Sequence, residues 1–139
     1  MANLSGKWYN ELGSMMELEV VDDTITGTFT ANTNGSVGVY PLTGRTDSDA
    51  SPDSQAVGFV VAWHRTPEDN LHSVTAWSGQ YQIIDGKEIL TTQWLLTREH
   101  IPEHNWSSTV VGHDTFTRTP PSKETIEVHL HSSLVPEPV

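Results

Sequence analysis

The sequence predicts an all-β fold, in which about eight antiparallel strands form an up-and-down β-barrel. Short β-rich runs recur between turn signals at roughly the 8–12-residue spacing of a sandwich or barrel, and no stretch keeps a helical period. Asp85-Gly86 lies between two apolar pairs and is a strong signal for a two-residue hairpin turn. The 139 residues suit one domain of the usual size.

The strands are expected where β-branched and aromatic residues alternate with polar ones. In chain order these runs cover residues 6–12, 16–21, 24–31, 37–45, 56–64, 72–83, 87–97 and 107–118. Asp22-Asp23 is a second two-residue hairpin signal, so neighbouring strands are expected to pair antiparallel. Residues 46–55 and 66–70 are rich in turn formers and are expected to be solvated loops.

The barrel domain is expected to cover residues 1–119, and residues 120–139 form a C-terminal tail that begins near Pro120-Pro121. Ile126, Val128 and Leu130 alternate with polar residues, which predicts one edge strand in the tail. Two further prolines near the end of the chain are expected to fray that strand.

Charge and composition exclude several partners. Seven Lys and Arg against eighteen Asp and Glu give a formal net charge of −11, which repels phosphate backbones and anionic membrane surfaces. Neither a nucleic acid nor a membrane is therefore an expected partner. Five tryptophans concentrate large, rigid apolar surface in few positions, which favours binding.

The chain has no cysteine, which removes disulfides, thiolate nucleophiles and cysteine-based zinc sites and leaves the compartment undecided. No apolar run approaches the roughly 20 residues of a membrane span, and Met1-Ala2-Asn3 lacks the features of a signal peptide. The chain is therefore expected to be mature or to be made without a signal. Asn-x-Ser triplets at Asn3, Asn34 and Asn105 suit a secreted glycoprotein, yet they also arise by chance.

Residues of one parity in a strand share a face, so each run divides into inward and outward sets. The inward sets mix bulky aromatics with small polar groups. They are Trp8, Asn10, Leu12 and Ser14; Val57, Phe59, Val61 and Trp63; Ser73, Thr75, Trp77 and Gly79; Thr92, Trp94 and Leu96; and Val110, Gly112, Asp114 and Phe116.

This mixture is unsuited to a plain core, because a buried hydroxyl, amide or carboxylate costs free energy unless it finds a partner. A compact ligand is one such partner, and about eight strands enclose a barrel wide enough for a small molecule. The alternative is that these polar groups bond the backbone or one another, and the pattern alone leaves both possibilities open.

Two motifs resemble catalytic patterns, but their sequence context does not support catalysis. His100-Ile-Pro-Glu-His104 has the spacing of an inverted zinc-protease motif, but Pro102 and the surrounding strands disfavour the helix that this motif needs. Ser, His and Asp are present without a Gly-x-Ser-x-Gly elbow, and the neighbours His113 and Asp114 point to opposite faces of a strand. A hydrolase of small esters is therefore disfavoured, and no enzyme is predicted.

Longer segments resemble the avidin family, and most of all its streptavidin and fungal members. The matching segments are Gly6-Lys-Trp-Tyr-Asn-Glu-Leu-Gly-Ser14, Ile25-Thr-Gly-Thr28, Leu42-Thr-Gly-Arg45, His72-Ser-Val-Thr-Ala-Trp-Ser-Gly-Gln-Tyr81, Thr92-Gln-Trp-Leu-Leu-Thr97 and Ser108-Thr-Val-Val-Gly-His-Asp-Thr-Phe-Thr117. The resemblance implies a secreted, usually tetrameric eight-stranded barrel that binds biotin with high affinity and without catalysis or cofactor. Streptavidin has a barrel of this kind and binds biotin with extreme affinity.

The resemblance also implies a role for each site residue. Asn10 and Ser14 would donate to the ureido oxygen of biotin, and Asp114 would accept from a ureido N–H. Ser73 would face the carboxylate and Thr75 the ring sulfur. The apolar walls would be Leu12, Trp63, Trp77, Trp94 and Leu96; a lid would use Asn34, Gly35 and Ser36; and Trp106 would reach the site of a neighbouring subunit.

Two positions depart from the family. Phe29 stands where the family usually has a Tyr donor to the ureido oxygen, and Ala31 where it has Ser or Thr. Each lost hydrogen bond costs about 1–3 kcal/mol, which predicts tight binding that is weaker than the family's best unless Thr30, Thr33 or water compensates. A rival interpretation is an oligomeric scaffold with weak biotin affinity, or a barrel for another ureido or peptide ligand.

Overall fold

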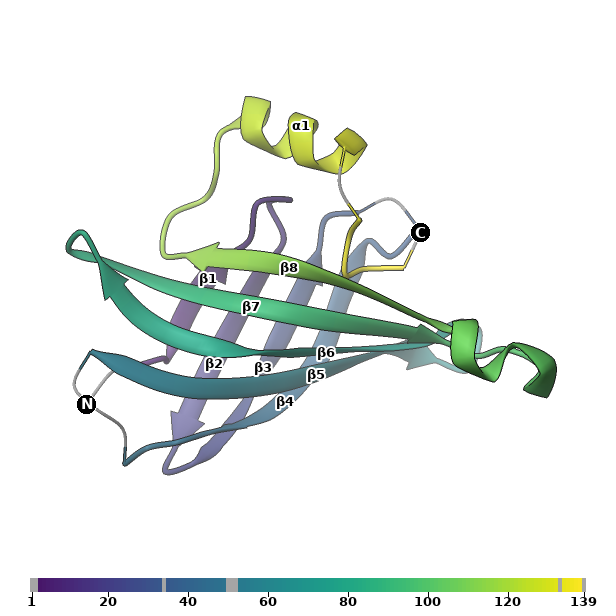
Figure 1. Cartoon of the computed structure of the whole chain (residues 1–139), viewed down its shortest axis with the longest axis horizontal. Coiled ribbons are helices and arrows are strands. Elements are labelled where there is room, and N and C mark those ends of the chain that lie inside the picture. Colours follow the sequence, from purple (N-terminus) through teal and green to yellow (C-terminus); the bar gives the residue numbers. More distant parts are fainter. Residues whose placement is uncertain (1–2, 34, 50–52, 133, 139) are drawn as a thin grey trace.

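The computed structural model describes residues 3–33, 35–49, 53–132 and 134–138. Within these residues, eight strands in the order β1 to β8 form one closed barrel (Figure 1). Each strand pairs antiparallel with its neighbours along the chain, and β8 returns to pair with β1. The predicted all-β, eight-stranded, up-and-down barrel is therefore confirmed.

The strands lie close to the predicted runs and lengthen toward the C-terminal half of the barrel. Their bounds are β1 Gly6–Tyr9, β2 Met15–Val21, β3 Thr24–Ala31, β4 Gly38–Thr46, β5 Ser54–Thr66, β6 Asp69–Ile84, β7 Lys87–Arg98 and β8 Thr109–Thr117. A short 3-10 helix, η1, covers Pro102–Ser107, and an α-helix, α1, covers Lys123–Ser132.

Both predicted hairpin turns are present. Asp22 has a φ of 54°, and Asp85 and Gly86 have φ of 52° and 77°, the left-handed values that tight hairpin turns require. These turns join β2 to β3 and β6 to β7 at one end of the barrel. In an up-and-down barrel the β1–β2, β3–β4, β5–β6 and β7–β8 connections then share the opposite end, which we call the site end.

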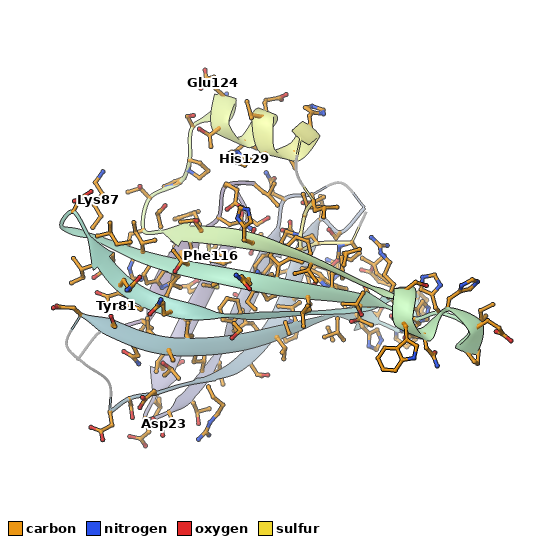
Figure 2. The ribbon with its side chains drawn as sticks, in the orientation of Figure 1. Asp23, Tyr81, Lys87, Phe116, Glu124 and His129 are labelled. Atoms are coloured by element: carbon orange, nitrogen blue, oxygen red, sulfur yellow. The ribbon has the colours of Figure 1, made fainter. Side chains whose placement is uncertain are left out.

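The barrel interior is filled by the inward side chains that strand alternation predicts. On β5 the buried positions Val57, Phe59, Val61 and Trp63 alternate with more exposed ones. Trp8 packs edge-on against Tyr81 with ring centroids 6.3 Å apart, and Figure 2 shows Phe116 within the ribbon of the barrel. Burial of these aromatics accounts for much of the hydrophobic contribution to folding.

One inward prediction is wrong. Val110 is 42% exposed, although it pairs in register with buried Leu96 on β7. The strand on the other side explains the difference, because the short β1 pairs with β8 at Tyr9 and Thr117, far from the start of β8. The first half of β8 therefore lacks a β1 neighbour beside it. Residues 107 and 108, predicted to begin this strand, belong instead to η1 and its C-terminal cap.

The tail also differs from its prediction as an edge strand. Residues 123–132 form α1, which lies outside the barrel beside β8 (Figure 1). Ser122 caps the helix, because its Oγ accepts from the Thr125 backbone N–H at 3.1 Å. Half-buried positions at Thr125, Ile126, His129 and Leu130 have helical spacing, and Figure 2 shows Glu124 and His129 on different sides of α1, with His129 toward the barrel.

None of the helices in the described part of the chain has the length and apolar character that a membrane span requires.

Candidate functional site

Asn10 lies at the site end, directly after β1. Its Oδ1 accepts from the backbone N–H groups of Leu12 and Ser14, both at 3.1 Å, and its carbonyl oxygen accepts from Gly13 N–H. Because Oδ1 accepts these two bonds, the orientation of the side-chain amide is fixed, and Nδ2 is left as a donor without a partner in these bonds. Nδ2 is buried and has no hydrogen-bond partner among the described residues. A buried unsatisfied donor is the kind of group that a ligand satisfies.

Ser14 begins the return of the chain into β2, and its side chain is completely buried. Its Oγ accepts from the Asn32 backbone N–H at 2.9 Å, so the hydroxyl proton is directed elsewhere. That proton is donated to Glu137 Oε1 at 2.7 Å. The predicted donor therefore faces the barrel interior with its orientation set by the backbone of the β3–β4 connection.

Thr33 joins this donor set, although it was not among the predicted site residues. Its hydroxyl donates to the same Glu137 Oε1 at 2.8 Å, and its side chain is 4% exposed. Phe29 and Ala31, both buried, bring no hydroxyl to the site. The sequence offers Thr33 only as a possible compensation for these two residues, because it does not show where the β3–β4 connection turns.

Asp114 lies on β8 and is 2% exposed. Its Oδ2 accepts from Trp77 Nε1–H at 2.8 Å. Burial raises the pKa of Asp114 well above its ordinary value, and the neighbouring Glu11 carboxyl raises the pKa further. Thr92 Oγ donates to the Asp114 carbonyl at 2.9 Å, which helps to hold this part of β8.

Aromatic rings enclose these polar groups. Phe29 is stacked on Trp77 with centroids 5.2 Å apart and meets Trp63 edge-on at 5.7 Å. Tyr40 also meets Trp63 edge-on, at 4.8 Å. Trp94 is fully buried and its Nε1 has no hydrogen-bond partner among the described residues. Leu12 and Leu96, the predicted aliphatic walls, are 1% and 2% exposed.

The two hydroxyls predicted on β6 are both buried. Thr75 Oγ1 accepts from Trp63 Nε1–H at 2.8 Å and donates to the Pro136 carbonyl at 2.6 Å. Ser73 Oγ is buried and unpaired within the described residues. The inner side of β6 therefore offers one hydroxyl oriented by a tryptophan and another that is still unsatisfied.

The predicted lid is described only in part. Asn34 lies outside the described residues. Gly35 is exposed, whereas Ser36 is buried, its backbone N–H donates to the Thr33 carbonyl at 3.1 Å, and its carbonyl accepts from the Tyr40 hydroxyl at 2.9 Å. These bonds make the connection a compact turn that presents Thr33 inward.

Trp106 differs from every other tryptophan. It lies in η1 and its side chain is fully exposed, with a relative accessibility of 101%. It makes no contribution to the interior of its own barrel. An indole exposed in this way is unusual for a monomer and is typical of a contact with another molecule.

The end of the chain supplies a part of the site that sequence reasoning missed. Pro136, Glu137 and Pro138 are buried, and Glu137 has no exposed surface. The prolines had been expected to fray the tail, but they enter the barrel at its site end. Figure 1 shows that residues 134–138, after α1, run back to the barrel. No local pattern in residues 134–138 indicates this long-range contact.

Hydroxyl and amide donors, a buried carboxylate and stacked indoles inside a closed barrel define a protein that binds a small ligand. The sequence profile of the Avidin family matches residues 1–119. Avidin-related protein 4/5 of Gallus gallus is 36% identical over 124 residues, which cover 84% of this chain and 77% of that protein. Avidin of Gallus gallus is 34% identical over 130 residues, 88% of this chain and 82% of that protein.

The same barrel is similar to part of a much larger protein. Fibropellin-1 of Strongylocentrotus purpuratus is 31% identical over 128 residues, which cover 84% of this chain and 11% of that protein. Together with the profile match, these similarities show that the chain belongs to the avidin family.

Proposed function

We propose that this chain binds biotin noncovalently inside the barrel and does not transform it. One observation carries the proposal: the Ser14 and Thr33 hydroxyls converge on a single buried oxygen, at 2.7 and 2.8 Å. A ureido oxygen at that position would accept from both, and the free Asn10 amide supplies a further buried donor. Membership of the avidin family supports the identity of the ligand.

The remaining groups suit the rest of biotin. Asp114 is a buried acceptor for a ureido N–H, held in place by Trp77 Nε1–H. Thr75 lies beside Trp63, where a thioether would meet both an apolar ring and a hydroxyl donor. Ser73 has an unsatisfied hydroxyl for the biotin carboxylate.

The affinity should be lower than that of family members with a full set of ureido contacts. Phe29 preserves the aromatic wall through its contacts with Trp63 and Trp77, but it offers no hydroxyl. The Thr33 hydroxyl, from the β3–β4 connection, is a further donor near this end of the site. Ala31 leaves one ureido N–H without an acceptor at its position. The missing hydrogen bond costs about 1–3 kcal/mol of binding free energy, and each 1.4 kcal/mol corresponds to roughly tenfold in affinity.

The site is proposed to be noncatalytic and free of cofactors. Its hydroxyls are oriented by backbone and indole N–H groups and act as donors. Asp114, the acidic group of the predicted site, is engaged by Trp77 rather than by a nucleophile. A base poised beside a nucleophile is what a hydrolase would need.

We also propose a homotetramer. An apolar row runs across the outer face of the barrel, because Val60 pairs with Ala76, Ala76 with Leu95, and Leu95 with Val111. Val60, Leu95 and Val111 are 42%, 50% and 57% exposed. A second copy of this chain would cover the row, and the exposed Trp106 would extend toward a neighbour's site.

Calorimetry with biotin, combined with native mass spectrometry, tests these proposals. We expect one biotin per chain and a tetrameric mass. Ser14→Ala and Asp114→Ala should each weaken binding by roughly tenfold or more, since each removes a buried partner. Thr28→Ala, on the outer side of β3, is the matched control and should bind like the parent chain. Equal affinity in all four proteins would contradict the proposed site.

A further inference from the structure

We propose that the barrel site has a second ligand, a short Pro-Glu-Pro peptide, which the chain supplies from its own C-terminus. Residues 134–138 would then act as a tethered ligand that must leave before biotin binds. The peptide site stands on the structure alone, whereas the competition with biotin rests on the proposed function. The distribution of exposure is the first support: Leu134 is 66% exposed, whereas Pro136, Glu137 and Pro138 are buried.

The hydrogen bonds of the segment come from the groups assigned to biotin. Ser14 and Thr33 donate to Glu137 Oε1, and Thr75 donates to the Pro136 carbonyl at 2.6 Å. Glu137 Oε1 thus lies where the ureido oxygen of biotin is proposed to bind. The Pro136 carbonyl likewise binds the Thr75 hydroxyl, which is proposed to contact the thioether of biotin. A bound tail and a bound biotin would need the same donors, so the two ligands exclude each other.

The composition of the segment suits an apolar, water-excluding site. Proline has no backbone N–H, so Pro136 and Pro138 bury no donor that would need a partner. Their fixed φ also lowers the entropy lost when the segment is ordered. Two acceptors of the segment, Glu137 Oε1 and the Pro136 carbonyl, find three hydroxyl donors, whereas Glu137 Oε2 is buried without a partner among the described residues. The segment is therefore bound by specific chemistry as well as by burial of apolar surface.

Helix α1 explains why the segment reaches the barrel of its own chain. The Ile126 side chain packs on Gly13 so closely that a Cβ added there would lie 2.7 Å from Ile126 Cδ1. Gly13 belongs to the turn between Asn10 and Ser14, so α1 is docked on the connection that builds the donor end of the site. This docking gives the tail a high effective concentration at the site.

The described strand pairs of the barrel all lie within residues 6–117 and do not include the tail. The pairing of β8 with β1 closes the sheet at Tyr9 and Thr117, and the eight strands form the closed barrel without residues 118–138. A chain that ends at Ser132 should therefore keep the barrel and α1 and leave the site open. Such a chain separates binding of the peptide from folding of the barrel.

Fluorescence anisotropy tests the peptide site directly. A fluorescein-labelled, C-terminally amidated peptide Leu-Val-Pro-Glu-Pro is titrated into the chain ending at Ser132. We expect saturable binding that unlabelled peptide and biotin both displace. A peptide with Ala in place of Glu should bind roughly 10- to 100-fold more weakly, since it loses the acceptor for two hydroxyls. A peptide with Gln keeps a carbonyl acceptor and should bind comparably.

Full-length protein gives a second, independent measurement. In stopped-flow tryptophan fluorescence, the rate of biotin binding should reach a plateau at high biotin, set by release of the tail. Glu137→Ala should remove the plateau. It should also raise the apparent affinity for biotin, because a larger fraction of the chains then has a tail-free site. Glu127→Ala, an exposed carboxylate on α1, is the control and should behave like the parent chain.

The outcomes separate this inference from the proposed function. If the shortened chain binds biotin but not the peptide, the tethered ligand is overturned and the biotin site stands. If it binds the peptide but not biotin, the inference stands and the proposed function fails. A plateau that disappears on dilution to monomers would place the tail in a second copy and overturn the intramolecular form.

Discussion

Ser14 Oγ donates a hydrogen bond to Glu137 Oε1 at 2.7 Å, although 123 positions separate the two residues in the chain. Thr33 donates to the same oxygen at 2.8 Å. A carboxyl oxygen of the chain itself therefore lies where two buried hydroxyls converge inside an avidin-family barrel. If the barrel binds biotin as proposed, ligand binding and the position of the C-terminal segment are coupled through these donors.

Binding of the tail should weaken as the pH rises. Burial raises the pKa of Glu137 above its ordinary value of 4.5, although the Ser14 and Thr33 hydroxyls lower it in part. Asp114 on β8 and Tyr40 on β4 interact electrostatically with the same carboxyl and add no positive charge. A group with a raised bound-state pKa contributes its full stabilisation below the free pKa and loses it as the pH rises through the bound-state pKa.

The measurement is the affinity of the Leu-Val-Pro-Glu-Pro peptide for the chain ending at Ser132, titrated from pH 4.5 upward. The affinity should fall with increasing pH. The peptide with Gln in place of Glu has no titrating side chain, so its affinity should depend less steeply on pH. The remaining pH dependence would come from Asp114 in the barrel, whose pKa is also raised. Equal slopes for both peptides would show that Glu137 is not the titrating group.

Gly112 leaves room for the buried Trp94 indole. A Cβ at this position would lie 2.3 Å from Trp94 Cζ2, too close for the two residues to coexist without displacing the indole. Gly112→Ala should therefore lower the free energy of unfolding by about 1–3 kcal/mol and weaken biotin binding. Thermal unfolding followed by circular dichroism and biotin calorimetry measure the two effects.

Gly58→Ala on β5 is the matched control for that substitution. Its added Cβ would meet the Trp77 carbonyl oxygen at 3.6 Å, an ordinary van der Waals distance. The control should unfold at or above the temperature of the parent chain, because alanine loses less backbone entropy than glycine on folding. Similar losses in both variants would refute a specific role for the Trp94 contact.

Restoring the two family hydroxyls should tighten biotin binding. In the chain ending at Ser132, Phe29→Tyr with Ala31→Ser should raise biotin affinity by roughly tenfold or more, since each regained hydrogen bond is worth about 1–3 kcal/mol. The open chain is the right background, because tail release no longer masks the change. Calorimetry that finds no gain would contradict the loss of affinity assigned to these two positions.

Arg118 joins the start of the chain to the barrel. Its guanidinium lies 3.8 Å from the centroid of the Trp8 ring, donates to the Asn3 carbonyl at 2.7 Å and pairs with Glu88. Arg118→Ala should cost about 1–3 kcal/mol of stability through lost packing and hydrogen bonds. Chemical denaturation checks this, with Lys123→Ala as control because Lys123 is an exposed cation at the start of α1 and takes no part in these contacts.

The sequence was sufficient to predict the barrel because alternation is a local property of a strand. Val57, Phe59, Val61 and Trp63 on β5 are buried as their parity predicts. The same argument fails for Val110, since exposure there depends on how far β1 extends beside β8. Burial of an inward residue requires a neighbouring strand, and the length of that strand is not encoded locally.

The tail shows a second limit. Ile126, Val128 and Leu130 alternate like a strand, but Ser122 caps a helix that buries Ile126 and Leu130 in part and leaves Val128 60% exposed. Over so few residues the periods of strand and helix are hard to separate. The burial of Glu137 was beyond sequence reasoning, because its partners Ser14 and Thr33 lie more than a hundred positions away.

Biotin calorimetry on the full chain and on the chain ending at Ser132 tests the central claim most directly. We predict one site per chain in both proteins, with a higher apparent affinity in the shortened chain because its donors are already free. Absence of biotin binding in both proteins, with the barrel shown intact by circular dichroism, would contradict the account.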